Sequence, residues 1–164
     1  MIVYYGEDSR HQYGLAFIVR KEVVGSIISC TPISSRLNSI RMSARPYSIT
    51  VIQVHAPTSD HERFYEQLDS IIAKTPKKDI LLVQGNWNAK VDTNAYQHYA
   101  GTEGRFGIGE TNDRGWRLRE FAKNQRPTLA NTLTPTSCLG QQPGMPVMGK
   151  FTTRWTHYSD TPTL

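Results

Sequence analysis

The fold can be worked out from one segment, Lys77-Lys78-Asp79-Ile80-Leu81-Leu82-Val83-Gln84-Gly85-Asn86-Trp87-Asn88-Ala89. Its short apolar run from Asp79 to Val83 is soon followed by glycine, which is typical of a buried strand rather than a helix. Two polar residues, Asn86 and Asn88, then flank a large aromatic. Because an α/β sheet presents its chemistry at the carboxyl ends of its central strands, both are candidate site residues. An ordinary turn, which favours asparagine, explains the spacing equally well.

The preceding residues predict a strand, a helix and a second strand. Tyr47 to Val54 is rich in β-branched residues, so we expect a strand that ends at His55-Ala56-Pro57. Ser59-Asp60 supplies N-cap chemistry for a helix that runs to about Lys74 and carries one apolar face. This succession is a crossover unit and implies some parallel pairing.

The remaining segments predict further elements on either side of the crossover. We expect Tyr13 to Arg20 and Val23 to Cys30 to form a strand pair joined by the charged turn Lys21-Glu22. Arg36 to Ala44 alternates loosely, which predicts a third strand with one apolar face. Glycines and polar residues from Gly101 to Asn112 predict a long loop, which is more often functional than idle.

A second helix and a short strand are expected after that loop. Asn112 or Asp113 can cap the helix, and Leu129 to Thr132 is predicted to be the strand. The apolar residues expected on the helix are Trp116, Leu118, Phe121 and Ala122.

Composition indicates one domain of modest size, with 164 residues, 38% hydrophobic and 20% charged. No apolar run is long enough for a membrane span and no secretory signal is visible, so we expect a cytoplasmic or nuclear protein that does not contact membranes. Cys30 and Cys138 lie far apart without metal-type spacing, which indicates neither a disulfide framework nor a zinc site. The formal charge of +5 favours a polyanionic partner such as DNA. The oligomeric state cannot be predicted.

Several motifs occur together in a recognisable order. Gly14 to Val19 reads G-L-A-F-I-V, Val51 to Thr58 reads V-I-Q-V-H-A-P-T, and Thr111 to Leu118 reads T-N-D-R-G-W-R-L, with Asn131-Thr132 further on. With the G-N-W-N at Gly85 to Asn88, these motifs resemble the endonuclease/exonuclease/phosphatase family, and most closely its retroelement-type, craniofacial development protein 2-like members. The resemblance covers nearly everything from Tyr4 to Thr132.

The resemblance implies an α/β fold, a partial two-sheet sandwich flanked by helices that lacks N-terminal strands and the C-terminal portion. It implies Mg²⁺-dependent hydrolysis of phosphodiester bonds in DNA and a retroelement origin. By resemblance, Asn88 stabilises the phosphorane-like transition state, Asn86 stands where an aspartate activates water, and His55 replaces a tyrosine that contacts the phosphate. Asn112 and Arg114 are candidate nucleic-acid-binding residues.

The departures from the family pattern predict little or no activity. Asn86 has a neutral amide in place of a carboxylate, and loss of a positioned general base removes ~10²–10⁴-fold in rate. The family's metal-binding glutamate and its terminal S-D-H motif are absent from the sequence, which puts Mg²⁺ binding in question. A non-catalytic remnant that binds nucleic acid or protein, or a phosphatase for small phosphoesters, stays open as an alternative.

The chain divides into a partial endonuclease-like domain, residues 1–134, and a tail, residues 135–164. The tail is crowded with Pro, Gly, Thr and Gln and shows no strand or helix periodicity, so we expect it to be irregular. Codons compatible with the tail can be reread in a shifted frame that starts at the third base of each codon. For Pro135 to Lys150 this frame permits N-K-L-S-R-T-A-T-W-H-A-x-D-G-K, and for Lys150 to Thr156 it permits V-H-N-Q-M-D. These letters resemble the T-W and H-N-x-I-D segment expected at this place in the family. We therefore hypothesise a frameshift near Pro135, which the coding DNA would test.

Overall fold

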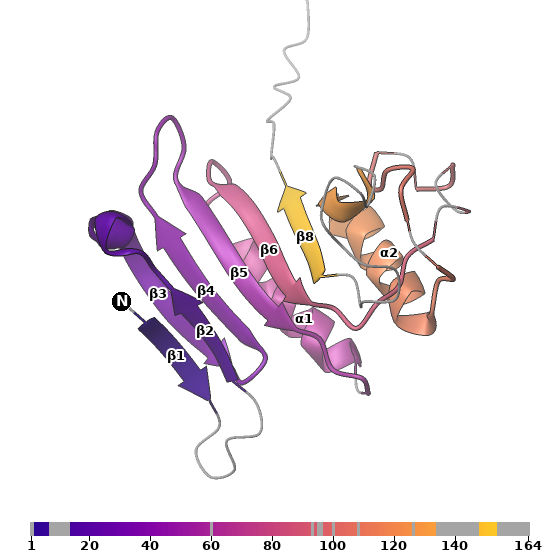
Figure 1. Ribbon diagram of the computed structural model, residues 1–164, viewed down its shortest axis with the longest axis horizontal. Coiled ribbons are helices and arrows are strands. Elements are labelled where there is room, and N and C mark those ends of the chain that lie inside the picture. Colours follow the sequence, from indigo (N-terminus) through magenta and orange to yellow (C-terminus); the bar gives the residue numbers. More distant parts are fainter. Residues whose placement is uncertain are drawn as a thin grey trace, which may run out of the picture.

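The computed structural model describes residues 2–6, 14–59, 61–92, 94, 97–99, 101–107, 109–125, 127–133 and 148–153. A six-stranded sheet has the order β3-β4-β5-β6-β8-β7, and a two-stranded sheet, β1-β2, packs over β3, β4 and β5 (Figure 1). The α/β class and the helix-flanked, two-sheet arrangement expected from the sequence are confirmed. The elements are β1 (Ile2–Gly6), β2 (Gly14–Ile18), η1 (Lys21–Ser26), β3 (Ile27–Ser34), β4 (Leu37–Met42), β5 (Ile49–His55), α1 (His61–Lys74), β6 (Ile80–Asn86), α2 (Asp113–Gln125), β7 (Thr128–Leu129), η2 (Ala130–Thr132) and β8 (Met148–Thr153).

The predicted crossover is present, because β5 and β6 pair in parallel and α1 connects them. Strand β6 continues past Val83 to Asn86, which is further than the apolar run indicated. Gly85 makes this extension possible: its φ is +140°, and an added Cβ would lie 1.9 Å from the carbonyl oxygen of Val54 on β5. Any other residue at this position would push the two strands apart.

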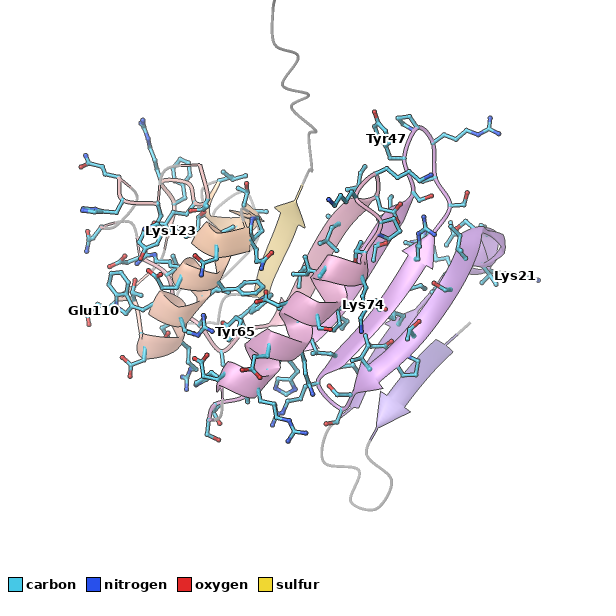
Figure 2. All side chains as sticks on the ribbon, turned by 180° about the vertical axis from the view of Figure 1, so that it is seen from behind. Lys21, Tyr47, Tyr65, Lys74, Glu110 and Lys123 are labelled. Carbon is cyan, nitrogen blue, oxygen red and sulfur yellow. The ribbon has the colours of Figure 1, made fainter. Side chains whose placement is uncertain are left out.

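Both faces of the central sheet are covered. On one face, α1 and α2 bury the larger core, which includes Leu37, Ile52 and Leu68 (Figure 2). On the other face, Phe17 of β2 packs with Ile40 and other residues of the central sheet. Neither α1 nor α2 is long and apolar enough to cross a membrane, and this holds for every helix in the described part of the chain.

Two details of the predicted strands are wrong, and the apolar face of β4 is confirmed. Strand β2 pairs with β1 instead of with residues 23–30, because Lys21–Ser26 forms a 3₁₀ helix and β3 then pairs with β4. Strand β4 has the expected apolar face, with Ile40 and Met42 in the smaller core, while its other face carries Ser39 and Arg41 beside the buried Leu37. Of the strand expected at Leu129 to Thr132, only its first residue is extended, and Ala130–Thr132 forms a 3₁₀ turn.

The tail expected to be irregular contains one strand. Strand β8 pairs antiparallel with β6 on one side and with β7 on the other, so the prediction was wrong for Met148–Thr153. Pairing uses backbone groups, which every non-proline residue supplies, so it needs no side-chain periodicity. Residues 135–147 and 154–164 lie outside the described residues, and the frameshift and the division into 1–134 and 135–164 stay predictions.

Asn38 on β4 generates a test of this packing. Its side chain is fully buried, and neither amide atom has a hydrogen-bond partner. Because an unpaired buried amide costs about 1–3 kcal/mol, we expect Asn38→Leu, which has a similar branched shape, to raise the free energy of unfolding by about that amount. Urea denaturation measures the change, and Asn38→Asp should be less stable than the wild type. A less stable Asn38→Leu variant would contradict the packing described here.

Candidate functional site

The predicted site residues meet where β5 and β6 end. His55 is opposite Asn86 in the parallel register, and the Ala56 N–H donates to the Asn86 carbonyl at 2.8 Å. Trp87 is only 1% exposed and points into the larger core. The centroid of its ring lies 6.2 Å from that of Phe64 and 6.5 Å from that of Tyr65. The spacing of the two asparagines thus follows from burial of the aromatic between them.

Asn88 connects three elements through hydrogen bonds. Its backbone N–H donates to Oδ1 of Asn86 at 2.9 Å, and its side-chain Nδ2 donates to the carbonyl of Ala56, after β5, at 2.8 Å. Its own carbonyl accepts from Nε of Arg114 at 2.6 Å and from Nδ2 of Asn112 at 3.3 Å. The φ of Asn88 is +51°, in the left-handed region that asparagine tolerates better than most residues.

Asn112 and Arg114 lie at the start of α2 and hold Asn88 in position. Oδ1 of Asn112 accepts from the N–H of Gly115 at 2.8 Å, which confirms Asn112 as a cap, and from the N–H of Lys90 at 3.0 Å. A Cβ at Gly115 would lie 1.9 Å from the Lys90 carbonyl oxygen, so glycine lets α2 approach the segment after Asn88. Contact of Asn112 and Arg114 with nucleic acid stays a prediction.

Arg36 is a neighbour of His55 that the sequence analysis missed. The His55 N–H donates to the Arg36 carbonyl at 3.0 Å, and Nη1 of Arg36 donates to the His55 carbonyl at 3.3 Å. Burial, and then the positive charge of Arg36, lower the pKa of the His55 imidazole. His55 is therefore neutral at neutral pH. Arg36 lies in the turn before β4 and meets His55 only because β4 pairs with β5, so no local pattern in the sequence indicates it.

Comparison with known proteins adds to this geometry. The chain is 43% identical to craniofacial development protein 2 of Bos taurus and of Tragulus javanicus over 137 residues, which are 80% of this chain. The matched region spans only 23% of the length of either relative. The structure is also similar to the endonuclease domain of TRAS1, a telomere-specific non-LTR retrotransposon. The TM-score is 0.59 at 16% identity, over 92% of this chain and 64% of that chain.

This chain has an endonuclease/exonuclease/phosphatase-like fold and is similar to craniofacial development protein 2. No protein-family model matches it. The resemblance expected from the motifs is thus confirmed by sequence and by fold. The endonuclease-like fold places His55, Asn86 and Asn88 together at one edge of the central sheet.

The oxygen atoms at this edge do not fit Mg²⁺. Mg²⁺ in proteins is held by carboxylates, water and substrate phosphates, and Oδ1 of Asn86 already accepts the N–H of Asn88. In the described part of the chain, no group of three or more His, Cys, Asp and Glu side chains could hold a metal ion. The described side chains at this edge therefore provide no carboxylate cage for a divalent cation.

A buried arginine network behind the site was also missed. Arg119 of α2 is fully buried and donates to both carboxylate oxygens of Glu103, at 2.8 Å and 3.1 Å. It also donates to the carboxylate of Asp92 at 2.9 Å and to the hydroxyl of Thr111 at 2.9 Å. These bonds hold the loop from Gly101 to Asn112 against α2, and a functional role for that loop stays a prediction.

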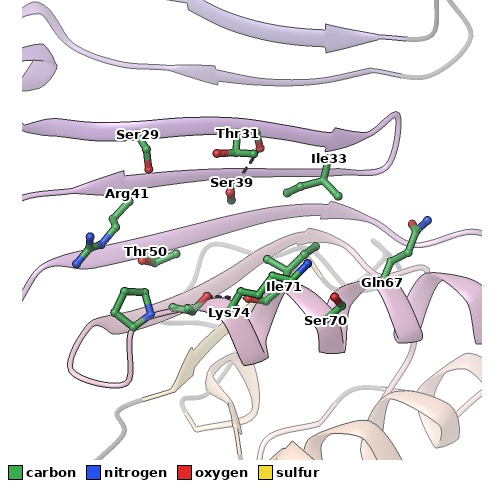
Figure 3. Close-up of a pocket in the computed structure, with 12 residues that line it drawn as sticks. Ser29, Thr31, Ile33, Ser39, Arg41, Thr50, Gln67, Ser70, Ile71 and Lys74 are labelled. Carbon is green, nitrogen blue, oxygen red and sulfur yellow. Dashed lines mark hydrogen bonds between the residues drawn. The ribbon is translucent and has the colours of Figure 1, made fainter.

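A groove of about 420 Å³ lies between α1 and β3, β4 and β5, on the helix side of the sheet (Figure 3). At one end, Arg41 donates to both oxygens of Asp79 at 2.6 Å and 3.0 Å, and Thr50 donates to Asp79 at 2.9 Å. The hydrogen bond from Arg41 lowers the pKa of the Asp79 carboxyl. Because Asp79 precedes β6, this end of the groove lies at the other end of the strand from the candidate site, and the charges of Arg41 and Asp79 are paired with each other.

Two arginines on α2 offer a matched test of the network. Removing Arg119 leaves Glu103 buried without its counter-charge, so Arg119→Met should lower the free energy of unfolding by about 3–5 kcal/mol. Arg117→Met removes a pair with Glu62, which is 73% exposed, and should have a much smaller effect. Urea denaturation of both variants checks the difference. Equal losses would show that the buried network does not stabilise the loop.

Proposed function

We propose that the edge formed by His55, Asn86 and Asn88 binds a phosphodiester group of DNA and that this chain hydrolyses it slowly or not at all. The observation that carries the proposal is the hydrogen bond from the Asn88 N–H to Oδ1 of Asn86, in register with His55. The endonuclease-like fold and the net charge of +5 support a nucleic-acid partner.

Two side chains at this edge can bind a phosphate oxygen. The neutral imidazole of His55 carries one N–H donor, which can take the place of the tyrosine hydroxyl expected from the family resemblance. The amide of Asn88 carries two hydrogens, and one of them is bonded to the Ala56 carbonyl. The second can donate to a phosphate oxygen that gains charge in the transition state.

Asn86 explains why hydrolysis would be slow. In an aspartate, one carboxylate oxygen would accept the Asn88 N–H and the other would orient or deprotonate water. In Asn86 the first oxygen is present and bonded to Asn88, but a neutral NH₂ group replaces the second. An amide nitrogen donates hydrogen bonds and does not accept a proton at neutral pH. The backbone geometry is therefore retained while the base is lost.

Asn86→Asp is the direct test, because it changes one atom and keeps the bond to Asn88. We expect nicking of a supercoiled plasmid to rise by ~10²–10⁴-fold over the wild type, the usual contribution of a positioned base. Asn124→Asp adds the same charge at an exposed position on α2 and serves as the control. The proposal fails if both variants cleave at the same rate, or if the wild type already turns over many substrates.

A further inference from the structure

We propose that Arg36 and His55 bind the DNA phosphate directly, with no divalent cation between the protein and the phosphate. This inference rests on the proposed function, since it takes DNA to bind at this edge, and it adds how the phosphate is held. It follows from three features of the described residues: the position of Arg36, the occupation of the oxygen atoms, and the charge.

Arg36 in the turn before β4 lies beside His55 at the end of β5, which is in register with Asn86 at the end of β6; we call these residues the Arg36–His55–Asn86 row. The N–H of His55 donates to the Arg36 carbonyl, and His55 is in register with Asn86. Alternation along β5 and β6 places the side chains of His55 and Asn86 on the sheet face that carries Ile40 and Val51, and Arg36 is next to His55 through hydrogen bonds in both directions. The Arg36 side chain thus lies beside the imidazole at the same edge of the sheet.

Most of the oxygen atoms around the row already accept hydrogen bonds. Oδ1 of Asn86 accepts from the N–H of Asn88, and the Asn86 carbonyl accepts from the N–H of Ala56. The carbonyl of Ala56 accepts from Nδ2 of Asn88, and that of His55 accepts from Arg36. The carbonyl of Asn88 accepts from two side chains of the α2 start. A hard cation would have to displace these bonds to find ligands.

What the site offers is donors and positive charge. Arg36 is half-buried and Arg114 lies next to Asn88, while the row itself contains no carboxylate. The Nδ2 group of Asn86, which stands in place of a carboxylate oxygen, is a donor. A guanidinium group matches phosphate geometry and is always charged, so it neutralises a phosphate without a metal ion. With an amide at position 86, this edge presents donors and positive charge, which favour an anion.

Binding of a fluorescently labelled DNA duplex, followed by anisotropy, tests the inference. The full chain is titrated at one fixed ionic strength, once with EDTA and once with Mg²⁺. The wild-type Kd should agree within about twofold between the two buffers, because no metal ion is needed. Arg36→Met should weaken binding about tenfold in both buffers, as expected for a lost hydrogen bond to a charged group. Arg45→Met, an exposed arginine in the turn before β5, is the matched control and should lose less than about threefold.

Two further variants separate a contact from a folding effect. Arg36→Lys keeps the positive charge but not the guanidinium group. It should therefore bind DNA more tightly than Arg36→Met and less tightly than the wild type. Asn86→Asp places a negative charge in the row and should weaken binding in EDTA. A purely structural role of Arg36 would predict neither result.

The outcomes distinguish the two proposals. If the wild type binds DNA only with Mg²⁺, or if Arg36→Met and Arg45→Met lose affinity equally, direct binding is overturned while the proposed function stands. If the wild type binds DNA in neither buffer, both proposals fail. Equal wild-type affinity in the two buffers, with selective loss in Arg36→Met, supports direct binding.

Discussion

The hydrogen bonds around Asn88 are the interaction on which the arrangement of the site depends. They connect the end of β5, the end of β6 and the start of α2, three places that are far apart in the sequence. Each bond uses either the Asn88 backbone or its side-chain amide. Asn88 also has a left-handed backbone, which asparagine tolerates and which turns the chain away from the sheet. These hydrogen bonds therefore fix the relative positions of the three segments.

Residues packed behind the site also stabilise this arrangement. Trp87 fills the core between the two asparagines, and Arg119 fixes the loop before α2 through buried carboxylates. None of these contacts needs the carboxylate that the family resemblance places at position 86. The fold therefore does not depend on whether position 86 carries an amide or a carboxylate.

The parts that the sequence predicts correctly depend on local signals. A β-branched run predicted β5, and an apolar helix face followed by a second apolar run predicted the parallel crossover to β6. That crossover brings His55 to Asn86, so the central geometry of the site was accessible from the sequence. The cap at Asn112 was predicted for the same reason, since capping depends on neighbours within one turn.

The parts that it misses depend on distant partners. Strand β2 pairs with β1 because a 3₁₀ turn redirects the chain after it, and β8 is a strand because β6 and β7 offer it backbone groups. Arg119 looks like a surface residue until the loop brings Glu103 to it. Arg36 precedes a strand whose register is set by β5. No local pattern distinguishes these residues from others of their type.

The central claim is that the end of β5 and β6 is a preformed site for a phosphate group. Titration of the ¹⁵N-labelled chain with inorganic phosphate in EDTA, followed by ¹⁵N–¹H spectra, tests it most directly. The account predicts that the side-chain amide signals of Asn86 and Asn88 and the Nε–H signal of Arg36 shift together along one saturating curve. Signals that stay unchanged at this edge, or that shift only after Mg²⁺ is added, would contradict it.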